Sequence, residues 1–399
     1  MFTPSKKILE KYANVLINFA LNSGKGIKKG EVVLLQVPES AKPLLKELKI
    51  AVLKSGAFPI TQYLPEGLLR DYYEYASDEQ LKFFPAKYLR GRVDQMDHVV
   101  SIIADTDPYE LKGIDPKKIM LSGLASKPYS DWRNKKESKG KLTWTLGLYA
   151  TPEMAKEADM SLESYWKQII KGCYLDQKDP VKKWKETFKQ IEQLRRKLNN
   201  LDIVKLRVEA KDTDLTIGLD KNRMWLGGSG RNIPSYEIFI SPDCRRTEGY
   251  ITFTEPLFRY GDLITGVKLE FKKGRVVSSS ATKGENLLKE MIKTKGADMV
   301  GEFSLTDKRF SKIDKFMAET LFDENVGGKY GNTHIALGMA YKDSYPKDQA
   351  KVKKGEWAKM GYNDSSVHTD IVSTSNRKVT ATLKNGKELV IYQDGEFVI

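Results

Sequence analysis

The sequence predicts an α/β amino-terminal domain with a mostly parallel sheet, followed by a mixed α+β domain. In the first half, short apolar runs alternate with amphipathic runs, which is typical of parallel strands joined by crossover helices. From Leu201 onwards, short β-forming runs are separated by turn residues, which is typical of antiparallel hairpins. We therefore expect a first domain over residues 1–200, closed by a linker helix, and a second domain over residues 201–399.

The elements of the first domain begin with a buried-strand candidate at residues 32–37. Residues 41–54 carry leucine and valine at helical spacing, and Gly56 lies where a helix stop signal is expected. Turn-rich segments around Pro108 and Pro116 separate later apolar runs. We expect further strands at residues 58–64, 99–103 and 144–149.

A long amphipathic helix is expected to close the first domain. Asp179-Pro180 resembles an N-cap followed by proline at the first helical position. Lysine and arginine are frequent on the polar face of this helix. Such a face can either bind nucleic acid or be a solvated surface between two domains. The interspersed Glu186 and Glu192 favour the solvated surface. The apolar face is formed by Trp184, Phe188, Ile191 and Leu198.

The second domain is predicted to consist mainly of hairpins and a closing meander. Residues 204–208 and 215–219 can form one hairpin, and residues 267–271 and 275–277 another. Helices are expected at residues 285–294 and around residues 312–321. Tight turns are expected at Asn385-Gly386 and Asp394-Gly395.

Composition excludes several classes of protein. The chain has 399 residues, 40% of them hydrophobic, so it can bury a sizeable core. Its net charge of +14 permits attraction to nucleic acid, acidic membranes or anionic substrates without choosing among them. Two cysteines, Cys173 and Cys244, exclude a disulfide framework and suit a reducing compartment. No apolar run is long enough for a membrane span or a signal peptide, so we expect a cytoplasmic protein.

The three histidines, His98, His334 and His368, limit any chemistry that needs imidazole. His368 and Asp370 lie two residues apart, so on a strand both side chains project from one face, as paired ligands of one metal would need. A surface pair is the alternative for these two residues. His334 is followed by small and apolar residues, and its alternative interpretation is a hydrogen-bonded core histidine.

Acidic residues in apolar surroundings strengthen the case for metal. Glu237, Glu302 and Glu324 each lie among strand-forming or apolar residues, where an isolated carboxylate would carry a large desolvation cost. With Asp370 they supply four negative charges, which two divalent ions would neutralise. Carboxylates and two imidazoles suit zinc, cobalt, manganese or magnesium.

Several motifs give the chain its resemblance to a known family. The C-terminal half carries them in a specific order: residues 232–243, 300–303, 321–325, 334–341 and 363–370. Weaker matches in the first half lie at residues 29–33, 56–57 and 179–184. On these residues the sequence resembles, nearly from end to end, the thermophilic metalloaminopeptidase family of the aminopeptidase T and aminopeptidase S type, which is leucyl aminopeptidase-like.

The resemblance implies two cocatalytic divalent ions, peptide substrates with a free N-terminus, and a homodimer. It places a tyrosine beside the metals at Tyr341, whose hydroxyl could stabilise the oxyanion. We expect Glu302 or Glu237 to shuttle the proton to the leaving amine. The implied metal ligands are Glu237, Glu302, Glu324, His334, His368 and Asp370.

Two departures from the family pattern accompany this assignment. The link over residues 326–333 is a few residues longer than the family's, which bears on Glu324. Tyr236 stands where many relatives carry a second acidic residue, so the ligand is assigned to Glu237.

Other catalytic templates do not match. The single-zinc helical motif is absent, because His98 is followed by Val-Val-Ser-Ile, and residues 227–231 lack the lysine and spacing of a phosphate-binding loop. Two alternatives remain: a dinuclear hydrolase of phosphate esters, and a basic nucleic-acid-binding protein without catalysis. Within the metallopeptidase interpretation, neither nucleic acid nor a membrane is an expected partner.

Overall fold

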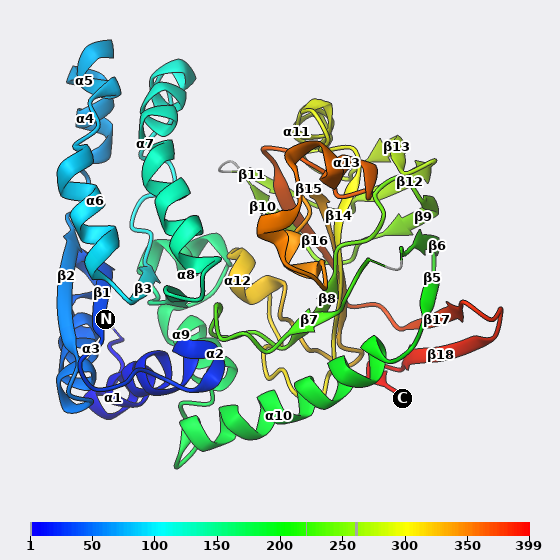
Figure 1. Ribbon diagram of the computed structural model, residues 1–399, viewed down its shortest axis with the longest axis horizontal. Helices are drawn as coiled ribbons and strands as arrows, with labels where there is room; N and C mark the ends of the chain where they lie inside the picture. Colours follow the sequence, from blue (N-terminus) through cyan, green and yellow to red (C-terminus); the bar gives the residue numbers. More distant parts are fainter. Residues whose placement is uncertain (1, 221, 260–261) are drawn as a thin grey trace. The chain divides into compact units, whose positions relative to one another are not determined.

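The computed structural model describes residues 2–220, 222–259 and 262–399 (Figure 1). The chain divides into two compact units. Unit 1 contains Met1–Lys185 and Ser229–Ile233, and unit 2 contains Glu186–Gly228 and Pro234–Ile399. The division falls inside helix α10 (Pro180–Asn199), so this helix contributes residues to both units.

Unit 1 is built on a parallel four-stranded sheet with the order β2-β1-β3-β4. The strands are β1 (Val32–Pro38), β2 (Phe58–Leu64), β3 (His98–Ile103) and β4 (Thr143–Leu148). Every neighbouring pair in it is parallel, as the alternation of strands and helices predicts. Helix α3 starts at Lys42 and ends at Lys54, just before Gly56, which adopts the positive φ expected at a helix stop.

The other helical segments of unit 1 precede, connect and follow these strands. In Figure 1, α7 runs beside α5 and α6, and the residue contacts agree. The segments are α1 (Lys6–Val15), the π-helix Leu16–Ala20, α2 (Leu21–Gly24), the 3-10 turn Glu39–Ala41, α4 (Leu69–Tyr75), α5 (Asp78–Lys82), α6 (Ala86–Gln95), α7 (Pro116–Glu137), α8 (Pro152–Glu157) and α9 (Leu162–Gly172).

Unit 2 contains two larger antiparallel sheets and a two-stranded one. An eight-stranded sheet has the order β13-β12-β9-β6-β5-β17-β18-β19, a five-stranded sheet has the order β16-β15-β14-β8-β7, and β10 pairs with β11. The strands are β5 (Ile203–Ala210), β6 (Thr213–Gly218), β7 (Leu226–Gly227), β8 (Glu237–Ile240), β9 (Thr247–Thr252), β10 (Leu257–Arg259), β11 (Asp262–Ile264), β12 (Lys268–Lys272), β13 (Arg275–Ser280), β14 (Val300–Thr306), β15 (Asn332–Gly338), β16 (His368–Ser373), β17 (Arg377–Leu383), β18 (Glu388–Gln393) and β19 (Glu396–Phe397).

Both predicted hairpins are present, because β5 pairs with β6 and β12 pairs with β13. The turns at Asn385-Gly386 and Asp394-Gly395 also form. The short helical segments of unit 2 are α11 (Glu285–Lys293), α12 (Thr320–Asp323), α13 (Lys354–Lys359) and the 3-10 turns Lys342–Ser344 and Gln349–Lys351. An α/β unit with a parallel sheet followed by a mostly antiparallel unit confirms the predicted fold class.

The prediction of a helix around residues 312–321 is wrong. Only Thr320–Asp323 is helical there, and Ala318 has a φ of 51°. The carboxylate of Asp323 accepts hydrogen bonds from the backbone N–H groups of Met317 and Glu319. These contacts hold the preceding segment in an irregular conformation, and helical spacing of apolar residues alone does not reveal them.

Helix α7 was not expected from the sequence. It spans Pro116–Glu137, contains Pro128 and has no fully buried residue, so it lacks the one-sided apolar stripe that periodicity detects. Among the described residues, no helix combines the length and the apolar character that crossing a lipid bilayer requires.

Candidate metal centre

The centre lies on one face of the five-stranded sheet of unit 2. Glu237 on β8 is opposite Thr306 on β14, His334 on β15 is opposite Ser304, and Asp370 on β16 is opposite Ala336. Because side chains two residues apart on a strand share a face, this register places five predicted residues on the same face. They are Glu237, Glu302, His334, His368 and Asp370.

A β-bulge lies directly before Glu302. The register between β14 and β15 shifts between Val300 and Glu302, with Gly301 as the extra residue. A Cβ atom at Gly301 would lie 2.4 Å from the backbone oxygens of both Gly338 and Met339. Glycine is therefore the residue that fits this bulge, and the regular pairing with β15 resumes at Glu302.

His334 stands at the middle of the cluster. Its Nε2 lies 3.2 Å from Glu302 Oε1, 3.4 Å from Glu237 Oε2 and 3.9 Å from Asp370 Oδ1. His368 Nε2 lies 3.5 Å from Asp370 Oδ1 and 3.9 Å from Glu302 Oε2. The donor atoms of both imidazoles and three carboxylates thus face one small volume.

These separations fit ligands of a divalent ion. Two donors that each lie about 2.1 Å from one ion in tetrahedral geometry are roughly 3.4 Å apart. Ligand atoms of Glu237, Glu302 and His334 all lie within 4.8 Å of one another. His334 is fully buried, and among the described residues its Nδ1 has no hydrogen-bond partner, so the polar contacts of this ring are those that its Nε2 makes with the carboxylates. Oxygen and imidazole donors in this spacing suit zinc, cobalt, manganese or magnesium.

Burial and mutual repulsion perturb the carboxylates. Burial, followed by the charge of Glu302, raises the pKa of Glu237 to about 7. Burial and then Glu237 raise the pKa of Glu324 well above its usual value. Asp370 differs, because the charge and hydrogen bond of His368 outweigh its burial and lower its pKa.

The histidines are correspondingly basic. Burial opposes protonation of His334, but its hydrogen bond to Glu302 and the charges of Asp370 and Glu237 outweigh burial and raise its pKa to about 9. His368 responds in the same way to Asp370, and its pKa also rises. Without a metal ion, the imidazole nitrogens that face the carboxylates carry protons. Binding of a cation would displace these protons.

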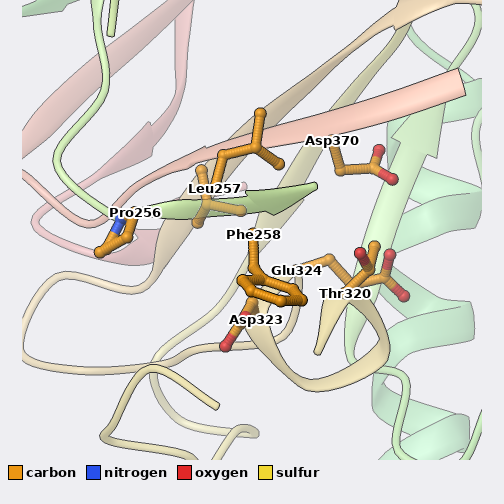
Figure 2. Close-up of a pocket in the computed structure, with 8 residues that line it drawn as sticks. Pro256, Leu257, Phe258, Thr320, Asp323, Glu324 and Asp370 are labelled. Atoms are coloured by element: carbon orange, nitrogen blue, oxygen red, sulfur yellow. The ribbon is translucent and has the colours of Figure 1, made fainter. Parts of the chain in front are cut away.

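Glu324 reaches the centre from outside the sheet, directly after α12. Figure 2 shows it beside a hollow that Asp370 also lines. Two buried asparagines hold its segment: the Asn325 side chain accepts from the Tyr236 N–H and donates to the Leu321 carbonyl, and Asn332 donates to the carbonyls of Glu324 and Val326. These contacts hold the backbone at Glu324, whose side chain lines the hollow together with Asp370.

The sequence reasoning did not assign a role to these asparagines. Asn325 lies inside the motif at residues 321–325 and Asn332 lies in the link over residues 326–333, but neither residue type gave a sign that it holds the segment of a candidate ligand. Ser235 was missed as well, and its hydroxyl donates to Glu237 Oε1 at 3.2 Å. Polar residues beside buried carboxylates are the signal that could have identified them.

Tyr341 lies at the open side of the cluster. Its ring centroid is 4.8 Å from that of His368, and its backbone N–H donates to the Ser241 hydroxyl. The residue remains 37% exposed, while partial burial, and then the charges of Glu302 and the other carboxylates, raise the pKa of its hydroxyl well above the usual value. The phenol therefore stays protonated and can donate a hydrogen bond.

Arg259, at the end of β10, brings a positive charge to the edge of the centre. Its Nη2 donates to the carbonyl oxygen of His368 at 3.3 Å, and its charge contributes to the low pKa of Asp370. The sequence reasoning did not select this residue.

Comparison with known proteins identifies the family. The profile of the thermophilic metalloproteases (M29) matches residues 5–397. The chain belongs to this family. Aminopeptidase PepS of Streptococcus thermophilus is 29% identical, with 99% of this chain and 98% of that protein covered. Aminopeptidase T of Thermus thermophilus is 28% identical, with 99% of each chain covered.

A solved structure agrees with the sequence comparisons. Wild-type AmpT from Thermus thermophilus superposes with a TM-score of 0.84 at 25% identity, covering 99% of this chain and 100% of that one. The predicted resemblance to the thermophilic metalloaminopeptidases is confirmed, as is the predicted enzyme class, a metal-dependent peptidase. Membership of the M29 family implies a divalent metal cofactor, and the buried donors of unit 2 fit one.

Proposed function

We propose that this chain is an aminopeptidase that releases N-terminal residues from peptides with the help of two divalent ions. The ligands would be the four carboxylates and two imidazoles already described: Glu237, Glu302, Glu324, His334, His368 and Asp370. The observation that carries this proposal is the convergence of both imidazoles and three of the carboxylates within 3.2–3.9 Å on one buried sheet face.

Charge balance supports two ions rather than one. Four carboxylates carry four negative charges, which two divalent ions neutralise once the histidines have lost their protons. A single dication would leave two of the four negative charges in a buried site, and Arg259 at the edge of the centre offsets only one of them. Burial, and then the neighbouring carboxylates, raise the pKa values of Glu237 and Glu324.

Each side chain has a task in this proposal. When bound, two divalent ions polarise the scissile carbonyl and acidify a water molecule. Glu302 accepts the proton of the attacking water and delivers it to the leaving amine. The hydroxyl of Tyr341 donates a hydrogen bond to the carbonyl oxygen as negative charge develops on that oxygen.

Activity toward N-termini is supported by the relatives, which are named aminopeptidases. The family match does not favour a phosphoesterase or a nucleic-acid-binding protein without catalysis. The positive net charge of +14, in which the buried carboxylates are already counted, then serves solubility.

The direct test combines activity with metal content. We expect purified protein to hold two divalent ions per chain, to hydrolyse an amino-acid anilide and to leave a phosphodiester intact, and we expect a chelator to abolish the hydrolysis. His368→Ala should lose the activity and bind less metal. Normal turnover by that variant would refute the site assignment, and cleavage of the phosphodiester would point to the alternative enzyme class.

We also propose that the protein forms a homodimer. Unit 1 exposes large apolar side chains around α4, α5 and α7, among them Leu68, Tyr75, Phe83 and Leu124, of which Tyr75 is 83% exposed. We infer that these exposed side chains contribute to the dimer interface. Sedimentation analysis should give twice the chain mass, and Tyr75→Asp with Phe83→Asp should give the monomer.

A cytoplasmic location is proposed on the thiols. Cys173 and Cys244 are both free and buried, and burial raises the pKa of Cys244 to about 11. Two unreactive thiols suit a reducing compartment. Cell fractionation with an antibody against the chain would test this location.

A further inference from the structure

Several completely buried polar atoms lie on the face of the sheet that carries the centre, and they have no hydrogen-bond partner in the part of the chain that the structure describes. They are Ser304 Oγ and Thr306 Oγ1 on β14, and Asn332 Oδ1 and His334 Nδ1 on β15. Buried polar groups in proteins are almost always hydrogen-bonded, so these atoms need an explanation. The proposed mechanism uses none of them.

The strand register groups these atoms into two pairs. Ser304 is directly opposite His334, and Thr306 is directly opposite Asn332. Directly opposite residues of an antiparallel pair point to the same face, and their Cβ atoms are about 4.5–5.5 Å apart. A serine or threonine hydroxyl has three staggered positions about its Cα–Cβ bond. Rotation between these positions brings each hydroxyl within hydrogen-bonding reach of the side chain opposite it.

Donors and acceptors match within each pair. A neutral imidazole that binds an ion through Nε2 carries its hydrogen on Nδ1, and a protonated imidazole carries a hydrogen on both nitrogens. His334 Nδ1 is therefore a donor with or without metal, and the hydroxyl oxygen of Ser304 can accept its hydrogen. In the second pair, the Asn332 amide group donates to two backbone carbonyls, which leaves its Oδ1 as an acceptor for the Thr306 hydroxyl.

We propose that Ser304 is a positioning residue for the centre, because its hydroxyl accepts the hydrogen of His334 Nδ1 in the metal-loaded protein and so holds Nε2 toward the ion. The inference rests on the proposed ligand role of His334. Hydrogen-bond partners on the far nitrogen of a ligating histidine fix the orientation of the ring, and their loss typically costs 10- to 100-fold in metal affinity. The sequence reasoning did not select Ser304.

Zinc titration calorimetry on the metal-free full chain tests this inference. Ser304→Ala should weaken zinc binding by about 10- to 100-fold, because the His334 ring loses the contact that orients it. Ser304→Thr keeps the hydroxyl and should restore most of the wild-type affinity.

Thr333→Val is the matched control. It also removes a buried hydroxyl that has no hydrogen-bond partner among the described residues of the chain. Thr333 directly precedes His334 on β15, so its side chain points to the opposite face of the sheet. This variant should bind zinc with wild-type affinity.

The imidazole N–H signals in a nuclear magnetic resonance spectrum give a readout that a purely structural role of Ser304 would not change. The chain contains three histidines, so isotope labelling of histidine gives a spectrum simple enough to assign. In the zinc-loaded wild type, the proton on His334 Nδ1 should lie downfield, as expected for a hydrogen-bonded imidazole. It should move upfield in Ser304→Ala and stay in place in Thr333→Val.

The inference is overturned if Ser304→Ala binds zinc with wild-type affinity, or if the signal of His334 Nδ1 is the same in this variant and in the wild type. An upfield position of that signal in the wild type would overturn it without any variant. Failure of the proposed function looks different, because the wild-type chain would then bind no zinc or, with zinc bound, would hydrolyse no amino-acid anilide.

Discussion

Buried histidines in the two units have opposite surroundings. In unit 1, His98 has both ring nitrogens in hydrogen bonds, Nδ1 with Thr143 Oγ1 at 2.8 Å and Nε2 with Glu31 Oε2 at 2.9 Å. In unit 2, His334 shares Nε2 among three carboxylates, and its Nδ1 has no partner among the described residues. The His98 ring thus has one neutral partner and one carboxylate, whereas the His334 ring is surrounded by three carboxylates.

This contrast separates a structural histidine from a candidate ligand. Both side chains are almost completely inaccessible, so burial does not distinguish them. What distinguishes them is whether the surrounding groups balance one another without an added cation. His98 needs nothing further, whereas the neighbours of His334 are balanced only when positive charge is supplied.

The strongest way to break the comparison is to remove each ring in turn. We expect His334→Ala to lower kcat/KM on an amino-acid anilide by about a thousandfold or more and to lower the metal content, because it removes a proposed ligand. His98→Ala should keep the activity and lose about 1–3 kcal/mol of unfolding free energy, because Glu31 and Thr143 lose a partner. Anilide kinetics, metal analysis and urea unfolding measure these effects. Loss of activity in both variants would contradict the distinction between a structural His98 and a ligand His334.

A second substitution separates catalysis from ligation in unit 2. Tyr341→Phe should lower kcat by about a hundredfold, because the hydrogen bond to the developing oxyanion is lost. The metal content should stay at the wild-type value, since the hydroxyl is not among the proposed ligands. Unchanged kcat would remove Tyr341 from the mechanism, and loss of metal would make it a ligand.

The clamp around Glu324 gives a weaker but more local effect. Asn325→Ala should reduce metal affinity by about 10- to 100-fold, because the segment that carries Glu324 loses its contacts with Tyr236 and Leu321. Titration calorimetry with the metal-free protein measures this change. Asn385→Ala, in a turn of the closing meander, is the control and should bind metal normally. Wild-type affinity in Asn325→Ala would mean that the clamp does not position Glu324.

The pH dependence of stability sharpens the same contrast. In the metal-free protein the pKa of His334 is raised from 6.5 to about 9, so its attraction to the carboxylates is fully present below pH 6.5 and is lost as the pH rises through 9. Bound metal displaces that proton. The difference in Tm between metal-loaded and chelator-treated protein should therefore grow from pH 6.5 to 9. A difference that stays constant would contradict the charge-balance argument.

The smallest expected effect lies in unit 1. Thr143→Val removes the hydroxyl that pairs with His98 Nδ1 and also accepts the Asn22 N–H, and should cost about 1 kcal/mol of stability. Activity and metal content should remain at wild-type values. Thermal unfolding and anilide kinetics provide the measurements, and a fall in metal content would show that unit 1 influences the centre.

Much of the fold could be predicted because its signals are local. The strand at residues 58–64 and helix α10 from Pro180 follow from apolar runs, period and capping residues, and both form as expected. Helix α7 escaped because its solvent-exposed surface carries no apolar period. The predicted helix before Glu324 failed because Asp323 bonds to backbone groups that helical spacing does not reveal.

The candidate site divides in the same way. His368 and Asp370 could be paired from a spacing of two on a strand, and Glu237 and Glu302 were suggested by charge in an apolar run. The bulge at Gly301 and the clamp at Asn332 depend on partners from distant strands, so no local pattern predicts them. The sequence thus predicted which residue types act as donors, whereas tertiary contacts determine where their side chains point.

The sheet register has a consequence for how the protein matures. The donors come from strands that begin as far apart in the chain as Glu237 and His368, and they meet only after β8, β14, β15 and β16 have aligned. Long-range β pairing of this kind is intrinsically slow to form. A nascent or truncated chain therefore lacks the complete donor set, and tight uptake of the ions would report that the whole carboxyl-terminal half has reached its native arrangement.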